Sequence, residues 1–151
     1  MRTTHIAAPV ERVFAFFAQP QNLALLTPPR LRFRVVQGPD RPLREGDRIV
    51  YAMRMHGIPV HWSSRIVSWR ENESFADLQE RGPFQRWLHT HRFASTPEGT
   101  EMRDEVEYEL PLGIAGRIAA GWFVRRELES VFDYRGQSLA QRLVELPGAR
   151  H

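Results

Sequence analysis

The sequence predicts an α+β fold in which a curved antiparallel sheet of about seven strands surrounds one long C-terminal helix. Two observations predict this fold. Between Leu31 and Leu110, apolar side chains recur at every second position, in runs separated by short polar turns. From Gly113 onward the apolar period becomes about 3.6 residues, as in an amphipathic helix. Such a helix must bury its apolar stripe, and the apolar face of the sheet is the available partner. The expected element order is β-α-α-β-β-β-β-β-β-α.

Prolines mark the N-terminal elements. The segment "THIAAP" is expected to form a short strand that ends at Pro9. Because proline is tolerated in the first turn of a helix and disrupts its interior, a helix is expected from Pro9 to Pro20. A shorter helix, "QNLALLTPP", should end at Pro28 and Pro29. The first helix has one apolar face, formed by Val10, Val13, Phe14 and Phe17.

The middle of the chain predicts a meander, followed by a long helix. Short turns rich in Gly, Pro and charged residues join the strands, which is typical of antiparallel hairpins. The strands are expected in "RLRFRVV", "DRIVYAMRM", "IPVHWSSRIVSW", "ESFADLQER", "FQRWLHTHRFAS" and "TEMRDEVEYEL". The apolar stripe of the helix consists of Ile114, Ile118, Trp122, Leu128, Phe132, Leu139 and Leu143. Pro147 and Gly148 should end this helix.

Composition narrows the class of protein. A chain of 151 residues with 42% hydrophobic and 26% charged residues fits one domain, 1–151, with a core of its own. The absence of cysteine excludes disulfides, thiolate catalysis and cysteine metal sites. The net charge is +3, and the arginines are spread from Arg2 to Arg150, so we expect no nucleic-acid partner. The sequence has neither a membrane-spanning run nor an apolar leader, so we expect a cytoplasmic protein without stable membrane insertion.

The stretch "FQRWLHTHRF" carries the strongest signal of a site. Alternate side chains of a strand point to one face, so two histidines share a face with two aromatic residues. The following strand has five charged residues on its other face, and a slip of one residue would bury them. This contrast fixes the parity, and a turn centred between Pro97 and Glu98 then fixes the register. The expected pairs are Trp87–Tyr108, His89–Val106, His91–Asp104 and Phe93–Met102.

Neighbouring elements extend this inward face. A turn centred on Pro83 pairs a third strand with the histidine strand. Its expected pairs are Phe75–His91, Asp77–His89 and Gln79–Trp87. Trp62, Ser64 and Ile66 share the inward parity of the preceding strand, whereas His61 and Arg65 face outward. The long helix contributes Phe132 and Arg135 to the same interior.

Four interpretations of the enclosed His–Asp–Arg cluster are open. It is a structural network, because buried carboxylates need partners, or it anchors the polar end of a ligand. If the protein is an enzyme, His91 and Asp104, with His89 and Asp77, form a general acid–base pair. A metal site of His89, His91 and Asp104 is the weakest of the four, because i, i+2 histidines are an unspecific signal. No cofactor is expected.

The chain resembles the SRPBCC superfamily, also called START-like or helix-grip proteins. The resemblance covers about residues 4–146 and is carried by "IAAPVERVFAFFAQPQNLALLTPP", "RGPFQRWLHTHRF", "EMRDEVEYELPLG" and "FDYR". The later motifs are similar to those of bacterial ligand-binding and polyketide cyclase/dehydrase-like members. The resemblance implies a helix-grip fold with a hydrophobic cavity between the sheet and the long helix.

The function predicted from these observations is the binding of a lipid, isoprenoid, quinone or polyketide-like molecule. Its polar anchors would be Asp77, Gln79, His89, His91, Asp104, Tyr108 and Arg135, and its walls Trp62, Phe75, Trp87, Phe93, Met102 and Phe132. A cyclase/dehydratase-type enzyme is the first alternative. The second is an interaction module, since related domains occur joined to nucleotide-sugar-epimerase-like proteins. A partner protein or a homodimer therefore remains open.

Overall fold

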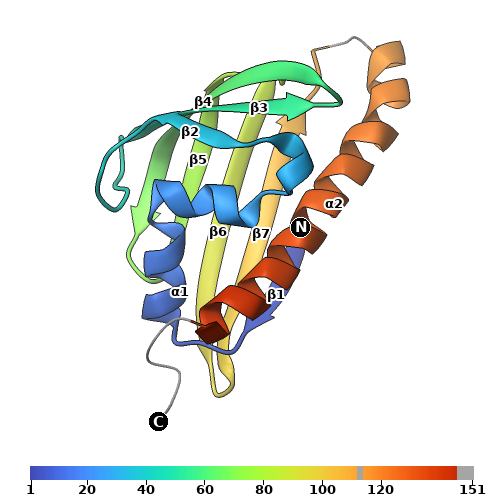
Figure 1. Cartoon of the computed structure of the whole chain (residues 1–151). Coiled ribbons are helices and arrows are strands. Elements are labelled where there is room, and N and C mark those ends of the chain that lie inside the picture. Colours follow the sequence, from blue (N-terminus) through green and yellow to red (C-terminus); the bar gives the residue numbers. More distant parts are fainter. Residues whose placement is uncertain (112–113, 146–151) are drawn as a thin grey trace.

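The computed structural model describes residues 1–111 and 114–145, with the side chains of 1–111, 121–139 and 141 (Figure 1). The seven strands, two α-helices and two short 3₁₀ helices of these residues follow the expected order with one 3₁₀ helix added. The elements are β1 (Arg2–Ile6), α1 (Val10–Phe17), η1 (Pro20–Leu26), η2 (Pro29–Leu31), β2 (Arg34–Gln37), β3 (Arg48–Met55), β4 (Ile58–Arg70), β5 (Ser74–Arg81), β6 (Arg86–Thr96), β7 (Gly99–Glu109) and α2 (Ile114–Glu145).

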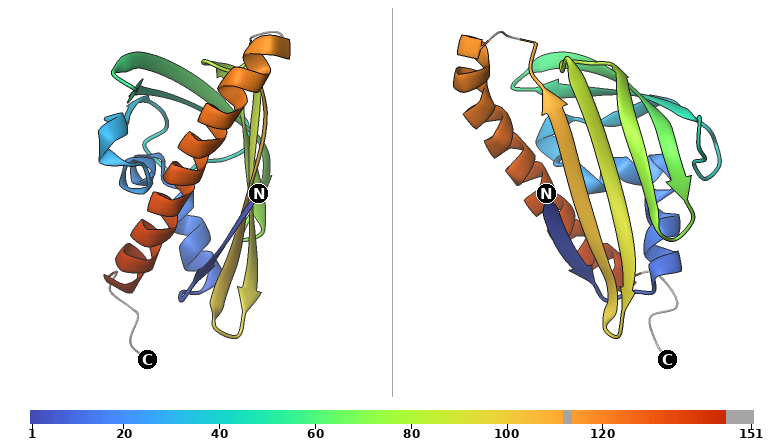
Figure 2. Two further views of the ribbon diagram at one scale, coloured as in Figure 1. Left: turned by 90° about the vertical axis from the view of Figure 1, so that its right-hand side faces the viewer. Right: turned by 180° about the vertical axis from the view of Figure 1, so that it is seen from behind.

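The strands form a single sheet in the order β1-β7-β6-β5-β4-β3-β2, and all neighbours are antiparallel. Figure 2 shows that both α-helices lie on the same face of this sheet, with α2 crossing it obliquely. The predicted architecture is thereby confirmed. One face of the sheet meets the helices, and the other carries the exposed charged residues of β7.

The expected register is confirmed at the histidine strand. All four predicted pairs between β6 and β7 are present, including His91 opposite Asp104. Between β5 and β6, Phe75 pairs with His91 and Asp77 with His89, but regular pairing ends before the expected third pair. Gln79 instead donates to the carbonyl of Phe84 at 2.7 Å and so closes the β5–β6 turn.

The segment between α1 and β3 differs from the prediction. The expected second helix is a 3₁₀ helix, η1, and a further 3₁₀ turn, η2, follows it. We expected a strand from Arg30, but β2 begins only at Arg34. Pro28 and Pro29 place the chain in the turn of η2, and Arg32 then adopts a left-handed conformation with φ 45°, which interrupts an extended strand.

The core lies between α1 and the part of the sheet formed by the start of β5, the end of β6 and the start of β7. Val13 and Phe17 are almost completely buried, and Phe14 makes edge-to-face contacts with Phe75 and Phe93. Burying one such side chain stabilises the fold by about 1.5–3 kcal/mol. From α2, Leu139 is fully buried in the same cluster, so this residue ties the long helix to the core.

Among the side chains that the structure describes, Leu128, Phe132 and Leu139 of the expected stripe of α2 face the sheet, and Trp122 does not. We expected Trp122 in the stripe, but it is 67% exposed, and Arg126 lies over its ring. At about 100° per residue, Trp122 lies roughly 200° around the helix from Val124, which does face the sheet. The side chains of Ile114, Ile118 and Leu143, and the predicted helix ends at Gly113, Pro147 and Gly148, lie outside the described residues. Within the described part of the chain, no helix is long and apolar enough to span a membrane.

Candidate ligand cavity and its polar cluster

A cavity of about 180 Å³ lies between the sheet and α2. Its walls are mainly apolar, because the inward-facing side chains of β3 and β4 meet the apolar stripe of α2 there. Helix α2 contributes Val124, Leu128, Val131 and Phe132. A polar cluster on the sheet consists of Asp77 of β5 with His89 and His91 of β6, and Glu127 of α2 is a separate polar group in the lining.

The sequence-predicted site residues separate into two groups. Those that line the cavity are Trp62, Phe75, Asp77, Trp87, His89, His91, Phe132 and Arg135. Phe93 and Met102, which we expected as cavity walls, lie in the core cluster with α1. Tyr108 packs against Phe84 and Trp87, outside the lining. Asp104 is 1% exposed and lies behind the two histidines.

Other lining residues were missed by sequence reasoning. Strand β3 contributes Ile49, Tyr51, Met53 and Met55, and the 3₁₀ segments contribute Leu23 and Leu31. The β3 residues had a detectable signal, because a tight turn at His56–Gly57 pairs Tyr51 with Trp62 and gives both the same face. Leu23 and Leu31 had no such signal in the sequence, because the irregular path of the chain through η1 and η2 places them at the cavity.

Asp104 is the centre of a buried polar network. Its Oδ1 atom lies 3.0 Å from His89 Nε2, in a hydrogen bond, and 3.4 Å from a terminal nitrogen of Arg135. His91 Nδ1 lies 2.7 Å from the same oxygen but at an oblique angle, so it has no well-formed hydrogen bond to a described residue. A carboxylate oxygen accepts and cannot donate, so Asp104 fixes the tautomer of His89, with the hydrogen atom on Nε2. Its distance of 2.7 Å from His91 Nδ1 favours a hydrogen atom on that nitrogen as well.

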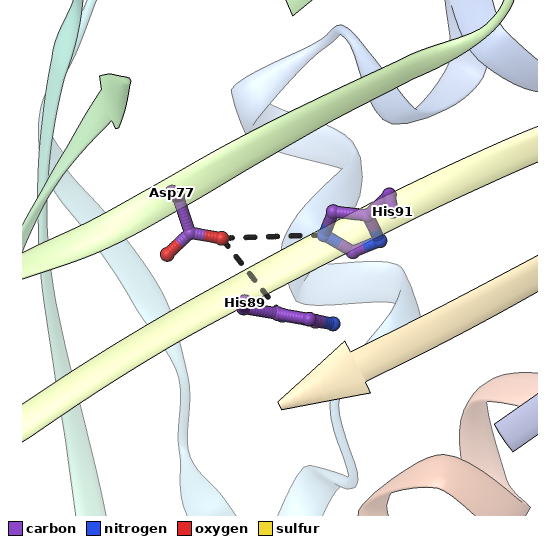
Figure 3. A group of neighbouring side chains, drawn as sticks. All are labelled: Asp77, His89 and His91. Atoms are coloured by element: carbon purple, nitrogen blue, oxygen red, sulfur yellow. Dashed lines mark ion pairs between the residues drawn. The ribbon is translucent and has the colours of Figure 1, made fainter. Parts of the chain in front are cut away.

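Asp77 faces the ring nitrogens that Asp104 does not contact, and Figure 3 shows one of its oxygens directed at both rings. Its Oδ1 atom lies 3.8 Å from His89 Nδ1 and 4.0 Å from His91 Nε2, both longer than a hydrogen bond. The hydroxyl of Ser64 donates to its other oxygen at 3.0 Å and itself accepts from the Trp62 indole at 3.1 Å. Tyr51 is also within hydrogen-bond distance of Ser64. Asp77 is thus held in place from β4 and directs one oxygen towards the histidines.

Burial and pairing shift the pKa values of Asp77 and Asp104 in opposite directions. Burial raises the pKa of Asp77 above its usual value, and nearby positive charge offsets only part of this effect. Burial also tends to raise the pKa of Asp104, but His91, His89 and Arg135 outweigh it and hold this pKa well below the usual value. Burial lowers the pKa of both histidines. Asp104 is therefore the ionised partner of Arg135, and both rings are neutral at pH 7.

Glu127 of α2 links three elements at the other end of the cavity. It accepts from Arg30 of η2, and its second oxygen lies 3.5 Å from His56 Nε2 in the β3–β4 turn. The His56 ring also contacts Phe123, with centroids 4.7 Å apart. Through the partly buried Glu127 and the exposed Arg30 and His56, this end joins η2, the β3–β4 turn and α2.

The residues able to hold a metal differ from the predicted set. We expected Asp104 as the third member, but the oxygen that faces the two rings accepts a hydrogen bond from His89 and is paired with Arg135. Asp77 Oδ1, His89 Nδ1 and His91 Nε2 instead face one another, all within 4.8 Å. Histidine nitrogens and a carboxylate oxygen are donors typical of zinc and iron sites.

A seven-stranded antiparallel sheet with a long C-terminal helix, and a cavity between them, defines the START-like helix-grip class. The family model of polyketide cyclase / dehydrase and lipid transport matches residues 1–144, and the chain belongs to this family. A comparison with curated proteins finds no match.

Solved structures agree in fold. The chain is similar to protein TTHA0849 of Thermus thermophilus, with 23% identity, a TM-score of 0.71 and 97% of each chain covered. It is similar to a START superfamily protein of Mycobacterium smegmatis, with 14% identity, a TM-score of 0.72 and 96% of each chain covered. A nucleoside-diphosphate sugar epimerase of Corynebacterium glutamicum is 23% identical with a TM-score of 0.67, over 95% of this chain and 29% of that one.

Proposed function

We propose that the protein binds an apolar or amphipathic small molecule in the cavity, with the polar end of the ligand against Asp77, His89 and His91. The observation that carries the proposal is the distribution of polarity in the cavity. Its walls are mainly aliphatic and aromatic, and Asp77, His89 and His91 converge in one polar cluster of the lining, as in sites that orient a ligand. Membership of a lipid-transport and polyketide-cyclase family supports small-molecule binding.

The cavity volume favours a small ligand or a ligand head. A dry cavity of about 150 Å³ holds one benzene ring, and the present cavity of about 180 Å³ is only slightly larger. One ring or a short branched chain therefore fits between α2 and the sheet. Among the predicted classes, this volume supports the ring of a quinone or polyketide-like molecule. A longer tail would have to extend beyond this volume.

Filling the cavity tests this proposal. Val131→Trp places a large ring in the lining, and we expect it to abolish binding of small phenols measured by calorimetry. Val36→Trp is the matched control, because Val36 on β2 is 53% exposed and lies outside the cavity. Native mass spectrometry of the purified protein would identify a bound molecule. Equal affinity of the two variants and the unaltered protein would refute binding in this cavity.

Acid–base catalysis of a cyclisation or dehydration is the second candidate function. The observation in its favour is that Asp77, whose pKa burial raises, faces two histidines whose pKa burial lowers, so that the cavity lining contains both an acid and a base. Asp77→Asn should then abolish turnover of a polyketide-like substrate while the ligand still binds. Binding without turnover of any tested substrate would leave carriage as the function.

A partner enzyme is a further proposal. A domain of this fold occupies part of the Corynebacterium epimerase chain, which supports a role beside an enzyme of that type. Co-purification with a nucleotide-sugar epimerase would support it. A protein that elutes alone at its monomer mass in the presence of such an epimerase would contradict it.

A further inference from the structure

The inward face of the histidine pair contains three electron-pair donors that point towards a common centre (Figure 3). Because Asp104 accepts at His89 Nε2 and faces His91 Nδ1, the remaining ring nitrogens, His89 Nδ1 and His91 Nε2, carry lone pairs. These two nitrogens face Asp77 Oδ1. When Asp77 is ionised, this oxygen can accept a hydrogen bond but cannot donate one. Three acceptors facing one another repel unless a positive charge or a proton lies among them.

From this arrangement we propose that Asp77, His89 and His91 form a binding site for one divalent transition-metal cation of the Zn²⁺ or Fe²⁺ type. Two imidazole nitrogens and one carboxylate oxygen are the donors these ions prefer. All three residues line the cavity, so the remaining coordination positions face the space in which the small molecule would bind. The metal site does not depend on that ligand.

The distances between the donor atoms fit such an ion. They are 3.8 Å and 4.0 Å from Asp77 Oδ1 to the two nitrogens, and no pair exceeds 4.8 Å. A point equidistant from the three atoms then lies at most about 2.5 Å from each, whereas Zn²⁺ binds nitrogen and carboxylate oxygen at about 2.0–2.2 Å. Movements of a few tenths of an ångström would complete the coordination.

The surrounding groups match the outer shell of a metal site. Histidine ligands usually donate their second ring nitrogen to a carboxylate, which orients the ring and increases its basicity. Asp104 faces that nitrogen on both rings, and Ser64 donates to the outer oxygen of Asp77. Arg135 is paired with Asp104, so Asp77 is the carboxylate left to balance a cation, which would displace any proton that the raised pKa of Asp77 retains.

Metal titration without any organic ligand tests the site. Untagged protein, first stripped with a chelator, would be titrated with Co²⁺, read by its visible absorption, and with Zn²⁺, read by calorimetry. We expect one equivalent of each ion to bind. Asp77→Asn removes the anionic donor with little change of shape and should weaken binding more than an outer-shell change. Asp104→Asn leaves the three donor residues in place and should weaken binding by about 10–100-fold; because it also removes the charged partner of Arg135, its fold is first checked by circular dichroism.

His61→Gln is the matched control for His91→Gln. His61 is exposed on the outer face of β4, whereas His91 is 4% exposed at the cavity. We expect the control to bind one equivalent with unchanged affinity and His91→Gln to lose it. If His91→Gln does not fold, as judged by circular dichroism, Asp77→Asn alone decides the question. Absence of stoichiometric binding in the unaltered protein, or unchanged binding in Asp77→Asn, would overturn the proposal.

Discussion

Removal of Asp104 should destabilise the protein far more than removal of Asp77, although both are enclosed carboxylates beside the same histidines. Asp104 faces His89, His91 and Arg135 through one oxygen and is 1% exposed. In Asp104→Ala the guanidinium of Arg135, with a side chain 12% exposed, loses its carboxylate partner. Breaking such a buried pair costs about 3–5 kcal/mol of unfolding free energy. Asp77→Ala loses one hydrogen bond from Ser64, worth about 0.5–1.5 kcal/mol.

Urea unfolding monitored by tryptophan fluorescence measures both values, with a chelator present so that bound metal does not contribute. A double variant sharpens the test. Arg135→Met removes the charge that Asp104→Ala leaves unpaired, so the combined loss should be smaller than the sum of the two single losses. A loss below about 1 kcal/mol for Asp104→Ala, or strict additivity of the two variants, would refute a buried ion pair at this position.

Three further predictions concern other parts of the fold. The hydrogen bond from Arg41 lowers the pKa of Asp47 in the folded protein below its ordinary value of 3.8. The contribution of this carboxylate to the free energy of unfolding should therefore be complete above pH 3.8 and disappear as the pH falls through the folded-state pKa. Unfolding of Asp47→Asn against pH checks this, and an equal difference from the unaltered protein at acid pH would contradict it. Gly99→Ala should cost at least about 1–3 kcal/mol, because φ is +137° and the new Cβ would lie 2.2 Å from the Ile6 carbonyl oxygen; an unchanged melting temperature would exclude that strain. Leu139→Ala should cost about 2–5 kcal/mol by opening a hole in the core, and a loss below 1 kcal/mol in urea unfolding would show that α2 is not anchored there.

The sheet was predictable because strand parity is a strong constraint. Strand β7 exposes alternate charged residues, and a slip of one position would bury them, so the pairing of His91 with Asp104 could be placed from the sequence. The position of the turn between β6 and β7 then determined which residues pair along the whole hairpin. The same logic failed at Gln79, because its amide closes the β5–β6 turn where regular pairing has ended.

The shape of the cavity was less predictable, since it depends on distances between elements rather than on parity. Phe93 and Met102 have the inward parity of a cavity wall, but α1 covers that part of the sheet and takes them into the core. The side of Asp104 that faces the cavity is likewise occupied by the two histidines. Parity identifies the face of a side chain, and only the packed helix decides whether a cavity lies above it.

The position of the two imidazole hydrogens leads to a last prediction about ligand choice. Because Asp104 Oδ1 faces one nitrogen of each ring, the other two ring nitrogens are the acceptors that the metal-free cavity presents to a ligand, together with Asp77 when it is ionised. Above the raised pKa of Asp77, a ligand that donates a hydrogen bond should therefore bind more tightly than a carboxylate of the same size, which would meet the charge of Asp77. Calorimetry with p-cresol and p-toluate tests this, since each has the single ring that the cavity volume admits. Binding of Zn²⁺ at the three residues should reverse the order, because the ion attracts the carboxylate. Tighter binding of p-toluate to the metal-free protein would show that Arg135, rather than Asp77, faces the ligand.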